Sequence, residues 1–125
     1  MTLLLIALIA LAGGAGAAAR FVVDGLVRSW ARTALPLGTI VINLSGSLLM
    51  GILAGLVMAH QAPESLQLIL GTGFLGGYTT FSTASLETVR LVQSGRTGLA
   101  LLNGAGTMAA CVGAAAAGVG LVMLL

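Results

Sequence analysis

The sequence predicts an all-α membrane protein with four transmembrane helices, on the basis of three observations. Hydrophobic residues make up 58% of the 125 residues and charged residues only 6%, whereas soluble proteins carry about 25% charged residues. A transmembrane helix needs about 20 apolar residues. Four stretches reach that length, and only short polar loops separate them, at 2–27, 37–59, 65–91 and 97–125. We therefore expect a single four-span domain over residues 1–125, embedded in the lipid bilayer.

The first segment, 2–27, is apolar and contains a run of small residues that ends in Arg20. No basic region precedes it, so we expect a mature span rather than a secretory signal. Small residues allow close approach of a neighbouring helix. Two roles stay open for Arg20. It forms either a positive vestibule that attracts anions, or a structural pair with backbone carbonyls or with Asp24, four residues further on.

The second segment, 37–59, has polar and small residues at every fourth position. This spacing places them on one face of a helix: Thr39, Asn43, Ser47, Gly51 and Gly55. The face begins polar and ends with small residues. It therefore suits a wall of a water-lined path at one end and close helix packing at the other.

The third segment, 65–91, carries the most informative run, Gly71–Thr83. Glycines are followed by four hydroxyl residues at what must be the middle of the membrane: Thr79, Thr80, Ser82 and Thr83. Lipid offers no hydrogen bonds, so polar groups at this depth lie against protein or a water-filled path. They are costly there and usually functional. We therefore place the functional site in this run.

The fourth segment, 97–125, carries Asn103, Thr107 and Cys111 at a spacing of four residues, and its other faces are rich in Gly and Ala. Spans two, three and four thus each contribute neutral hydrogen-bond donors, namely Asn43, Ser82 with Thr83, and Thr107. Neutral donors suit a small anion better than a cation, which prefers carboxylates or carbonyls. The electropositive ring edge of Phe81 supports the same interpretation.

Other classes of protein fit the sequence less well. A small multidrug-type exchanger needs a mid-membrane carboxylate, whereas Asp24 and Glu87 lie toward span ends and Glu64 lies in a loop. A non-transporting assembly subunit accounts for the small-residue faces but not for the polar run. We expect no enzyme, because His60 lies in a loop without a catalytic or metal partner. The five arginines and three acids give no indication of nucleic-acid binding.

Three motifs resemble the Fluc/CrcB family of fluoride channels. They occur in the family's order and are specific in combination: Gly13-Gly14 with Arg20-Phe21, Pro36-Leu37-Gly38-Thr39 with Asn43-Leu44, and Gly73 to Thr83. The resemblance covers the whole chain. It implies an antiparallel, dual-topology dimer with two fluoride pores, which passively exports cytoplasmic fluoride across the cell's inner membrane.

The resemblance also implies roles for individual residues. The third helix would be broken at mid-membrane over Gly76 to Thr79. Backbone carbonyls of Gly76 and Thr79 from both subunits would hold a central structural sodium ion. The remaining roles fall on the pathway: Asn43 as the pore asparagine, Phe81 as the first box phenylalanine, Ser82, Thr83 and Thr107 as the polar track, and Arg20 as the family's first-span arginine.

Ala84 is a departure from the family pattern, which usually reads Thr-Phe-Ser-Thr-Phe. Here the run is Thr80-Phe81-Ser82-Thr83-Ala84, so the second box phenylalanine is missing. Either Phe81 and the hydroxyls suffice, or a partner subunit completes the pore, or conduction is reduced.

The arginines are distributed unevenly over the loops. The first and third loops and their margins contain four of them, while the second loop and the tails contain none: Arg28, Arg32, Arg90 and Arg96. The positive-inside rule places these loops in the cytoplasm and both termini outside. A dual-topology homodimer should show little bias. We expect a homodimer, with a heterodimer formed with a paralogue as the alternative.

Overall fold

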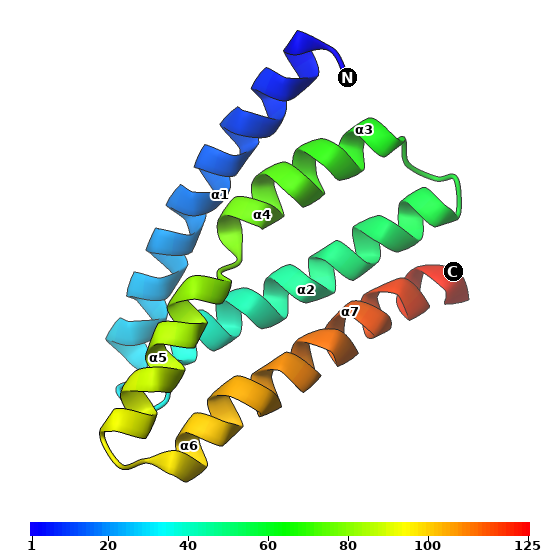
Figure 1. Cartoon of the computed structure of the whole chain (residues 1–125). Coiled ribbons are helices and arrows are strands. Elements are labelled where there is room, and N and C mark those ends of the chain that lie inside the picture. The colour runs from blue at the N-terminus through cyan, green and yellow to red at the C-terminus, as the bar shows by residue number, and fades with distance from the viewer.

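A computed structural model covers residues 1–125 and consists of helices joined by short loops (Figure 1). The helices are α1 (Leu3–Trp30), α2 (Leu37–Met58), α3 (Glu64–Leu66), α4 (Gly76–Tyr78), α5 (Phe81–Gln93), α6 (Thr97–Leu101) and α7 (Thr107–Leu124). Two π-helical stretches, η1 (Gln67–Leu75) and η2 (Leu102–Gly106), join α3 to α4 and α6 to α7. The chain contains no strand, so the all-α prediction is confirmed.

Three continuous helices are long and apolar enough to cross a membrane. They are Leu3–Trp30, Leu37–Met58 and the composite helix Thr97–Leu124. The third expected span is divided into two shorter pieces, α3–η1–α4 and α5. Neither piece reaches the length of about 20 residues that a span requires. The expectation of four helices therefore becomes three full-length helices and one interrupted segment.

The interruption lies slightly later than expected. Gly76, Gly77 and Tyr78 remain helical, and the two extended residues are Thr79 (φ −79°, ψ 159°) and Thr80 (φ −146°, ψ 124°). The predicted break over Gly76 to Thr79 is thus wrong for Gly76 to Tyr78 and agrees with the structure only at Thr79. The physical reason is hydroxyl chemistry, because the Thr80 side chain accepts a hydrogen bond from Thr83 N–H and caps α5. Threonine is a favoured residue at that position.

The glycines serve close packing instead. A Cβ on Gly16 of α1 would collide with the carbonyl of Phe74, and one on Gly77 would collide with the carbonyl of Gly13. Likewise, a Cβ on Gly51 of α2 would collide with the carbonyl of Ala115 in α7. These contacts bring α1 against η1 and α4, and α2 against α7, as the small-residue faces predicted.

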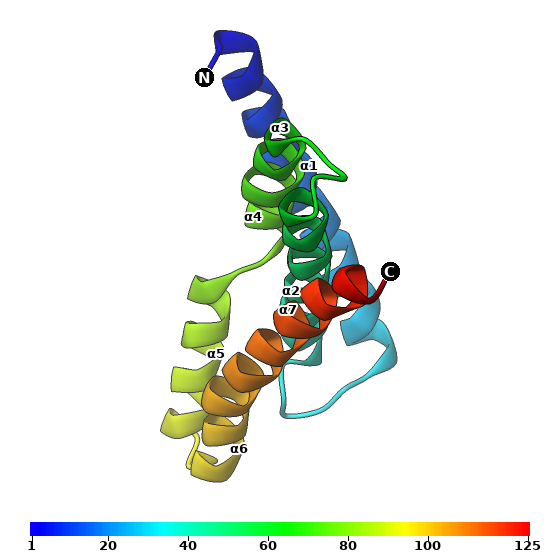
Figure 2. The same cartoon turned by 90° about the vertical axis from the view of Figure 1, so that its right-hand side faces the viewer.

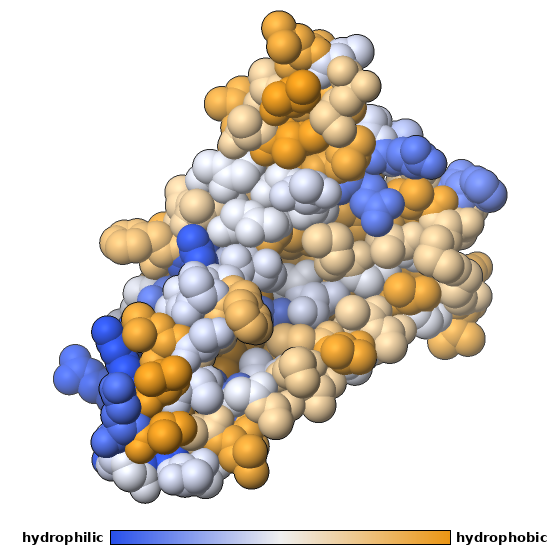
Figure 3. All heavy atoms as spheres, viewed as in Figure 1, coloured by the Kyte–Doolittle hydropathy of each residue, from blue (hydrophilic) through white to orange (hydrophobic).

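The molecule has little core and much apolar surface. Its buried hydrophobic cluster consists of Ile42, Leu75 and Tyr78. By contrast, apolar and neutral side chains cover most of the visible face, and hydrophilic ones gather mainly at its upper right and lower left (Figure 3). A soluble chain would bury such surface, whereas a bilayer solvates it. The protein is therefore a multi-pass membrane protein.

The half-helix α5 is set apart from the other elements. Figure 2 shows it beside α6 and the start of α7, separated from α4 by the extended link. Its only buried residue is Leu91, near its far end. Its position therefore depends on the contacts described next.

Candidate functional site

Asn43 of α2 forms hydrogen bonds with the break in the third segment. The Asn43 side chain donates from Nδ2 to the Thr80 carbonyl (2.9 Å), and its Oδ1 accepts from Thr80 N–H (2.9 Å). Both backbone groups of Thr80, a residue only 8% exposed, are thereby paired. Buried backbone groups need such partners once a helix stops. Asn43, predicted as the pore asparagine, therefore lies at the break and stabilises it.

The hydroxyls around the break have distinct partners. Thr79 Oγ1 donates to the Leu75 carbonyl (2.9 Å), back toward the preceding turn. Thr80 Oγ1 lies 3.1 Å from Thr83 Oγ1, to which it donates, and 3.4 Å from Ser82 Oγ. Since Thr83 Oγ1 accepts this bond, its own proton is free to be donated elsewhere. Ser82 is exposed.

A groove of about 620 Å³ lies on one side of the break, between α2, α5, η2 and α7. It contains three of the predicted pathway residues: Asn43, Phe81 and Thr107. Phe81 is 86% exposed. Ala84, the residue that departs from the family pattern, also lines the groove. The groove has polar donors at intervals along otherwise apolar walls.

A smaller hollow of about 300 Å³ lies on the other side of the break. Arg20, Asp24, Thr39 and Thr83 line it, and Thr80 lines both this hollow and the groove. The structure thus places Arg20 and Thr83 together, apart from Phe81 and Thr107. Ser82 lines neither cavity.

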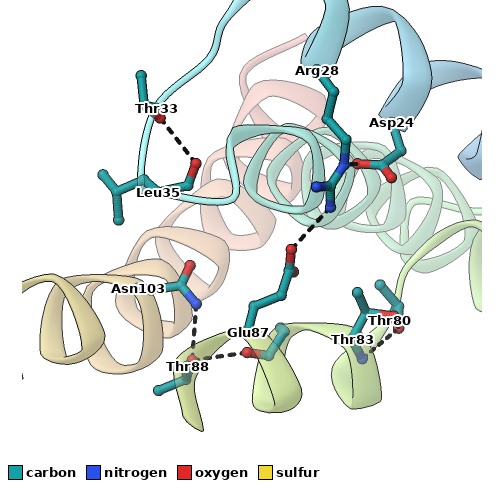
Figure 4. A network of polar contacts seen from close by, with 10 residues as sticks. Asp24, Arg28, Thr33, Leu35, Thr80, Thr83, Glu87, Thr88 and Asn103 are labelled. Carbon is teal, nitrogen blue, oxygen red and sulfur yellow. Dashed lines mark hydrogen bonds and ion pairs between the residues drawn. The ribbon is translucent and has the colours of Figure 1, made fainter. Parts of the chain in front are cut away.

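Asp24 pairs with Arg28 rather than with Arg20. Arg28 Nε donates to Asp24 Oδ1 (2.9 Å), and Arg28 Nη2 donates to Glu87 Oε2 of α5 (3.0 Å), as Figure 4 shows. The predicted alternative of an ion pair between Arg20 and Asp24 is therefore wrong. The Arg28–Glu87 contact joins residues 59 positions apart, and no local pattern in the sequence indicates it.

Two further polar contacts were missed. Asn103 Nδ2 donates to Thr88 Oγ1 (2.8 Å), which donates to the Ala84 carbonyl (2.8 Å) (Figure 4). Asn103 is only 4% exposed, and both side chains line the groove. The spacing of Asn103 and Thr107 gave a signal for the first residue. Nothing local distinguished Thr88.

Tyr78, which the sequence did not assign to a site, lies in the last turn before the break. Its hydroxyl is 3.0 Å from Ser45 Oγ, and its ring stacks on Phe74 with centroids 6.1 Å apart. The side chain is 8% exposed. Tyr78 therefore packs the end of the first half of the interrupted segment against α2.

Gly76 and Thr79, the expected sodium ligands, flank the end of α4. In a continuous helix, Thr80 N–H would donate to the Gly76 carbonyl. Here it donates to Asn43 Oδ1 instead. The Thr79 carbonyl belongs to the extended link. No group of three or more His, Cys, Asp or Glu side chains lies together in the structure.

Comparison with known proteins identifies relatives along nearly the whole chain. Residues 7–119 match the family described as CrcB-like protein, Camphor Resistance (CrcB). The fluoride-specific ion channel FluC 1 of Leifsonia xyli subsp. xyli is 51% identical over 118 residues, which cover 94% of this chain and 86% of the relative. The fluoride-specific ion channel FluC of Novosphingobium aromaticivorans is 50% identical, covering 85% and 86%. That of Magnetococcus marinus is 47% identical, covering 88% and 90%.

Proposed function

This chain belongs to the CrcB-like family, and we propose that it forms a fluoride-selective channel that lets cytoplasmic fluoride leave the cell passively across the inner membrane. Its relatives are named as fluoride-specific ion channels, which supports fluoride as the ion. The structural observation that carries the proposal is the interrupted third segment. Its Thr79–Thr80 link lies between a groove that contains uncharged donors and the exposed Phe81, and a hollow that Thr83, Arg20 and Asp24 line.

The path takes a small anion by replacing its hydration shell. Fluoride holds water strongly, so a path must offer hydrogen-bond donors at short intervals. On the groove side these donors are Asn43 and Thr107, and on the hollow side the free Thr83 hydroxyl proton. Phe81 contributes its electropositive ring edge at the groove. Ser82 contributes at the surface beside Thr80, and Arg20 supplies positive potential in the hollow.

The channel is an antiparallel dimer of two copies inserted in opposite directions. Phe81 at the start of α5 is 86% exposed, and the groove beside it is open along α5 and α7. A second copy covers these surfaces and completes the walls of two equivalent pathways. This arrangement needs each subunit to supply both a groove and a Phe81 ring.

The break suits a structural sodium ion held without carboxylates. The Gly76 carbonyl has lost the donor that a continuous helix would provide, and the Thr79 carbonyl lies in extended backbone. Neutral carbonyl oxygens are good ligands for a hard cation. When bound, sodium would neutralise the carbonyl dipoles of the two subunits where they meet and so fix the break.

Fluoride efflux from liposomes tests the proposal, with a fluoride-selective electrode as the detector. The parent should empty the liposomes, and the Asn43→Asp and Phe81→Ile variants should conduct poorly, because one adds a repelling charge and the other removes a ring edge. Leu101→Ile is the control, since Leu101 is exposed and lines neither cavity. If both pathway variants conduct like the parent, the pathway assignment is wrong.

Ala84 supports a second candidate, a heterodimer in which a paralogue supplies the missing ring. Ala84 lines the groove beside Phe81, where an alanine methyl offers no ring edge. We propose the homodimer first, so the chain reconstituted alone should conduct. Efflux that appears only after a second protein is added would overturn the homodimer and establish the heterodimer.

A further inference from the structure

The half-helix α5 carries Phe81, Ser82 and Thr83 but is weakly packed. It follows a two-residue extended link, and only Leu91, near its far end, is buried. Apolar packing therefore does little to fix its first turn. Polar contacts hold it instead: the Asn43–Thr80 pair at its start, the Asn103–Thr88 bond on the α7 side and the Arg28–Glu87 ion pair on the α1 side.

The Arg28–Glu87 ion pair is the only one of these contacts that carries charge. The Glu87 side chain is 12% exposed, whereas that of Arg28 is 54% exposed. Glu87 Oε1 is buried and has no hydrogen-bond partner, so Arg28, through Oε2, is the only group that compensates this carboxylate. A buried charge that loses its partner is strongly unfavourable.

Glu87 also lies close to the pathway. It is four residues after Thr83, and residues at this spacing occupy one face of a helix. Thr83 lines the hollow with Arg20 and Asp24. Arg28 binds Asp24, which lines the hollow, as well as Glu87, which lies one helical turn after Thr83, so one guanidinium compensates both carboxylates. Without it, one negative charge would lie in a hollow that must admit an anion and a second would lie beside it.

We propose that Arg28 is a positioning residue of the pathway: it acts through Glu87, holding α5 against α1 and cancelling the Glu87 charge beside the hollow. This inference rests on the proposed channel function. Arg28 itself lines neither the groove nor the hollow. Its effect on conduction should therefore be large when Glu87 is ionised and much smaller when residue 87 is neutral, where only the more exposed Asp24 loses its partner.

A double-mutant cycle tests this dependence. Fluoride efflux is measured for the parent, Arg28→Gln, Glu87→Gln and the double variant, each reconstituted at equal protein density. In the parent background, Arg28→Gln should lower the efflux rate by at least about tenfold, because it leaves a buried carboxylate unpaired. In the Glu87→Gln background, the same substitution breaks only the partly exposed i,i+4 pair with Asp24. Such helix pairs contribute little, so the rate should change by no more than about twofold. Arg32→Gln is the matched control, since Arg32 is exposed in the loop and forms no ion pair.

The outcomes separate the two proposals. If Arg28→Gln is as harmful in the Glu87→Gln background as in the parent, or harmless in the parent, the positioning role is overturned. If the single variant does not fold, comparing Glu87→Gln with the double variant still decides the question. Thermal unfolding of the same four purified proteins gives a second double-mutant cycle, in which thermal stability is measured instead of the efflux rate. If the parent itself conducts no fluoride, the channel proposal fails, while coupling between residues 28 and 87 in thermal stability still tests the ion pair.

Discussion

Asn43 illustrates how one side chain makes a helix break possible inside a membrane. An interrupted helix leaves backbone groups without partners, and lipid cannot supply them. The carboxamide of Asn43 offers a donor and an acceptor in the same geometry as a peptide group, and it pairs with both backbone groups of Thr80. Few other side chains can do this, because Ser and Thr offer one oxygen and Asp offers only acceptors when ionised.

Replacing Asn43 by alanine should therefore destabilise the fold as well as the pathway. Thr80 N–H and C=O would both lose their partner, at a cost of about 1–3 kcal/mol for each buried group. The measurement is thermal unfolding of the purified protein in detergent. Ser47→Ala is the matched control, because Ser47 lies one turn further along α2 and lines the same groove but takes no part in the contact with Thr80. Equal melting temperatures for Asn43→Ala and the control would contradict the inference that Asn43 stabilises the break.

The sequence identified single residues of the site better than their partners. Asn43, Thr107 and Asn103 emerged from four-residue spacing, which places them on helix faces. The bond from Asn43 to Thr80 spans 37 residues and that from Arg28 to Glu87 spans 59, and no local pattern encodes such contacts. Asp24 has an arginine at a spacing of four residues on either side, Arg20 and Arg28, so local spacing does not decide which of the two it binds.

At the scale of elements, the small residues of α1 determine how closely it approaches the interrupted segment. Gly16 and Gly13 of α1 face the backbone of Phe74 and Gly77, so the two helices touch through main-chain atoms. In lipid, such close contact is a principal source of helix association. The end of α4, and hence the position of the break, depends on this packing.

Gly16→Val should separate α1 from α4. The new side chain would collide with the Phe74 carbonyl, and overpacking of this kind costs about 1–3 kcal/mol or more. Gly14→Val is the matched control: it makes the same substitution on the same helix, two residues away, where a Cβ meets nothing within 4 Å. Thermal unfolding should show a large loss for Gly16→Val and a small one for Gly14→Val. Equal losses would mean that helix propensity, not packing, governs both.

The boundaries of the helices were largely predictable from the sequence. For the break, the sequence predicted the segment that contains it but not its position within that segment. Hydrophobic stretches placed the helices close to α1, α2 and Thr97–Leu124. The glycines suggested that the helix would break from Gly76 onward. A glycine can nevertheless remain helical when a neighbouring helix packs on it, as Gly77 does against Gly13. The residues that left the helix were Thr79 and Thr80. Asn43 pairs with both backbone groups of Thr80, and the Thr80 hydroxyl accepts from Thr83 N–H at the start of α5.

At the scale of the whole molecule, the charges are gathered at one end. The loop after α1 and the loop after α5 both lie toward the lower end of the molecule in the two ribbon views, away from the loop after α2 (Figures 1 and 2). All arginines except Arg20 belong to this end. Two of the three acids, Asp24 and Glu87, are also there and are bound to Arg28. In the folded protein, the net charge of this end is therefore less positive than the number of arginines alone indicates.

The orientation of the chain tests the proposed homodimer, because an antiparallel pair needs both insertions. Cysteine is introduced at Gln61, in the loop after α2, or at Gln93, at the end of α5, in a Cys111→Ser background; both glutamines are exposed. Intact cells producing the chain alone are treated with a membrane-impermeant maleimide. We expect both positions to be labelled to similar extents, since half of the copies present each end to the outside. The positive-inside rule opposes this result, which makes the experiment decisive. Labelling confined to Gln61 would show one fixed orientation, and an antiparallel channel would then require a partner chain inserted the other way.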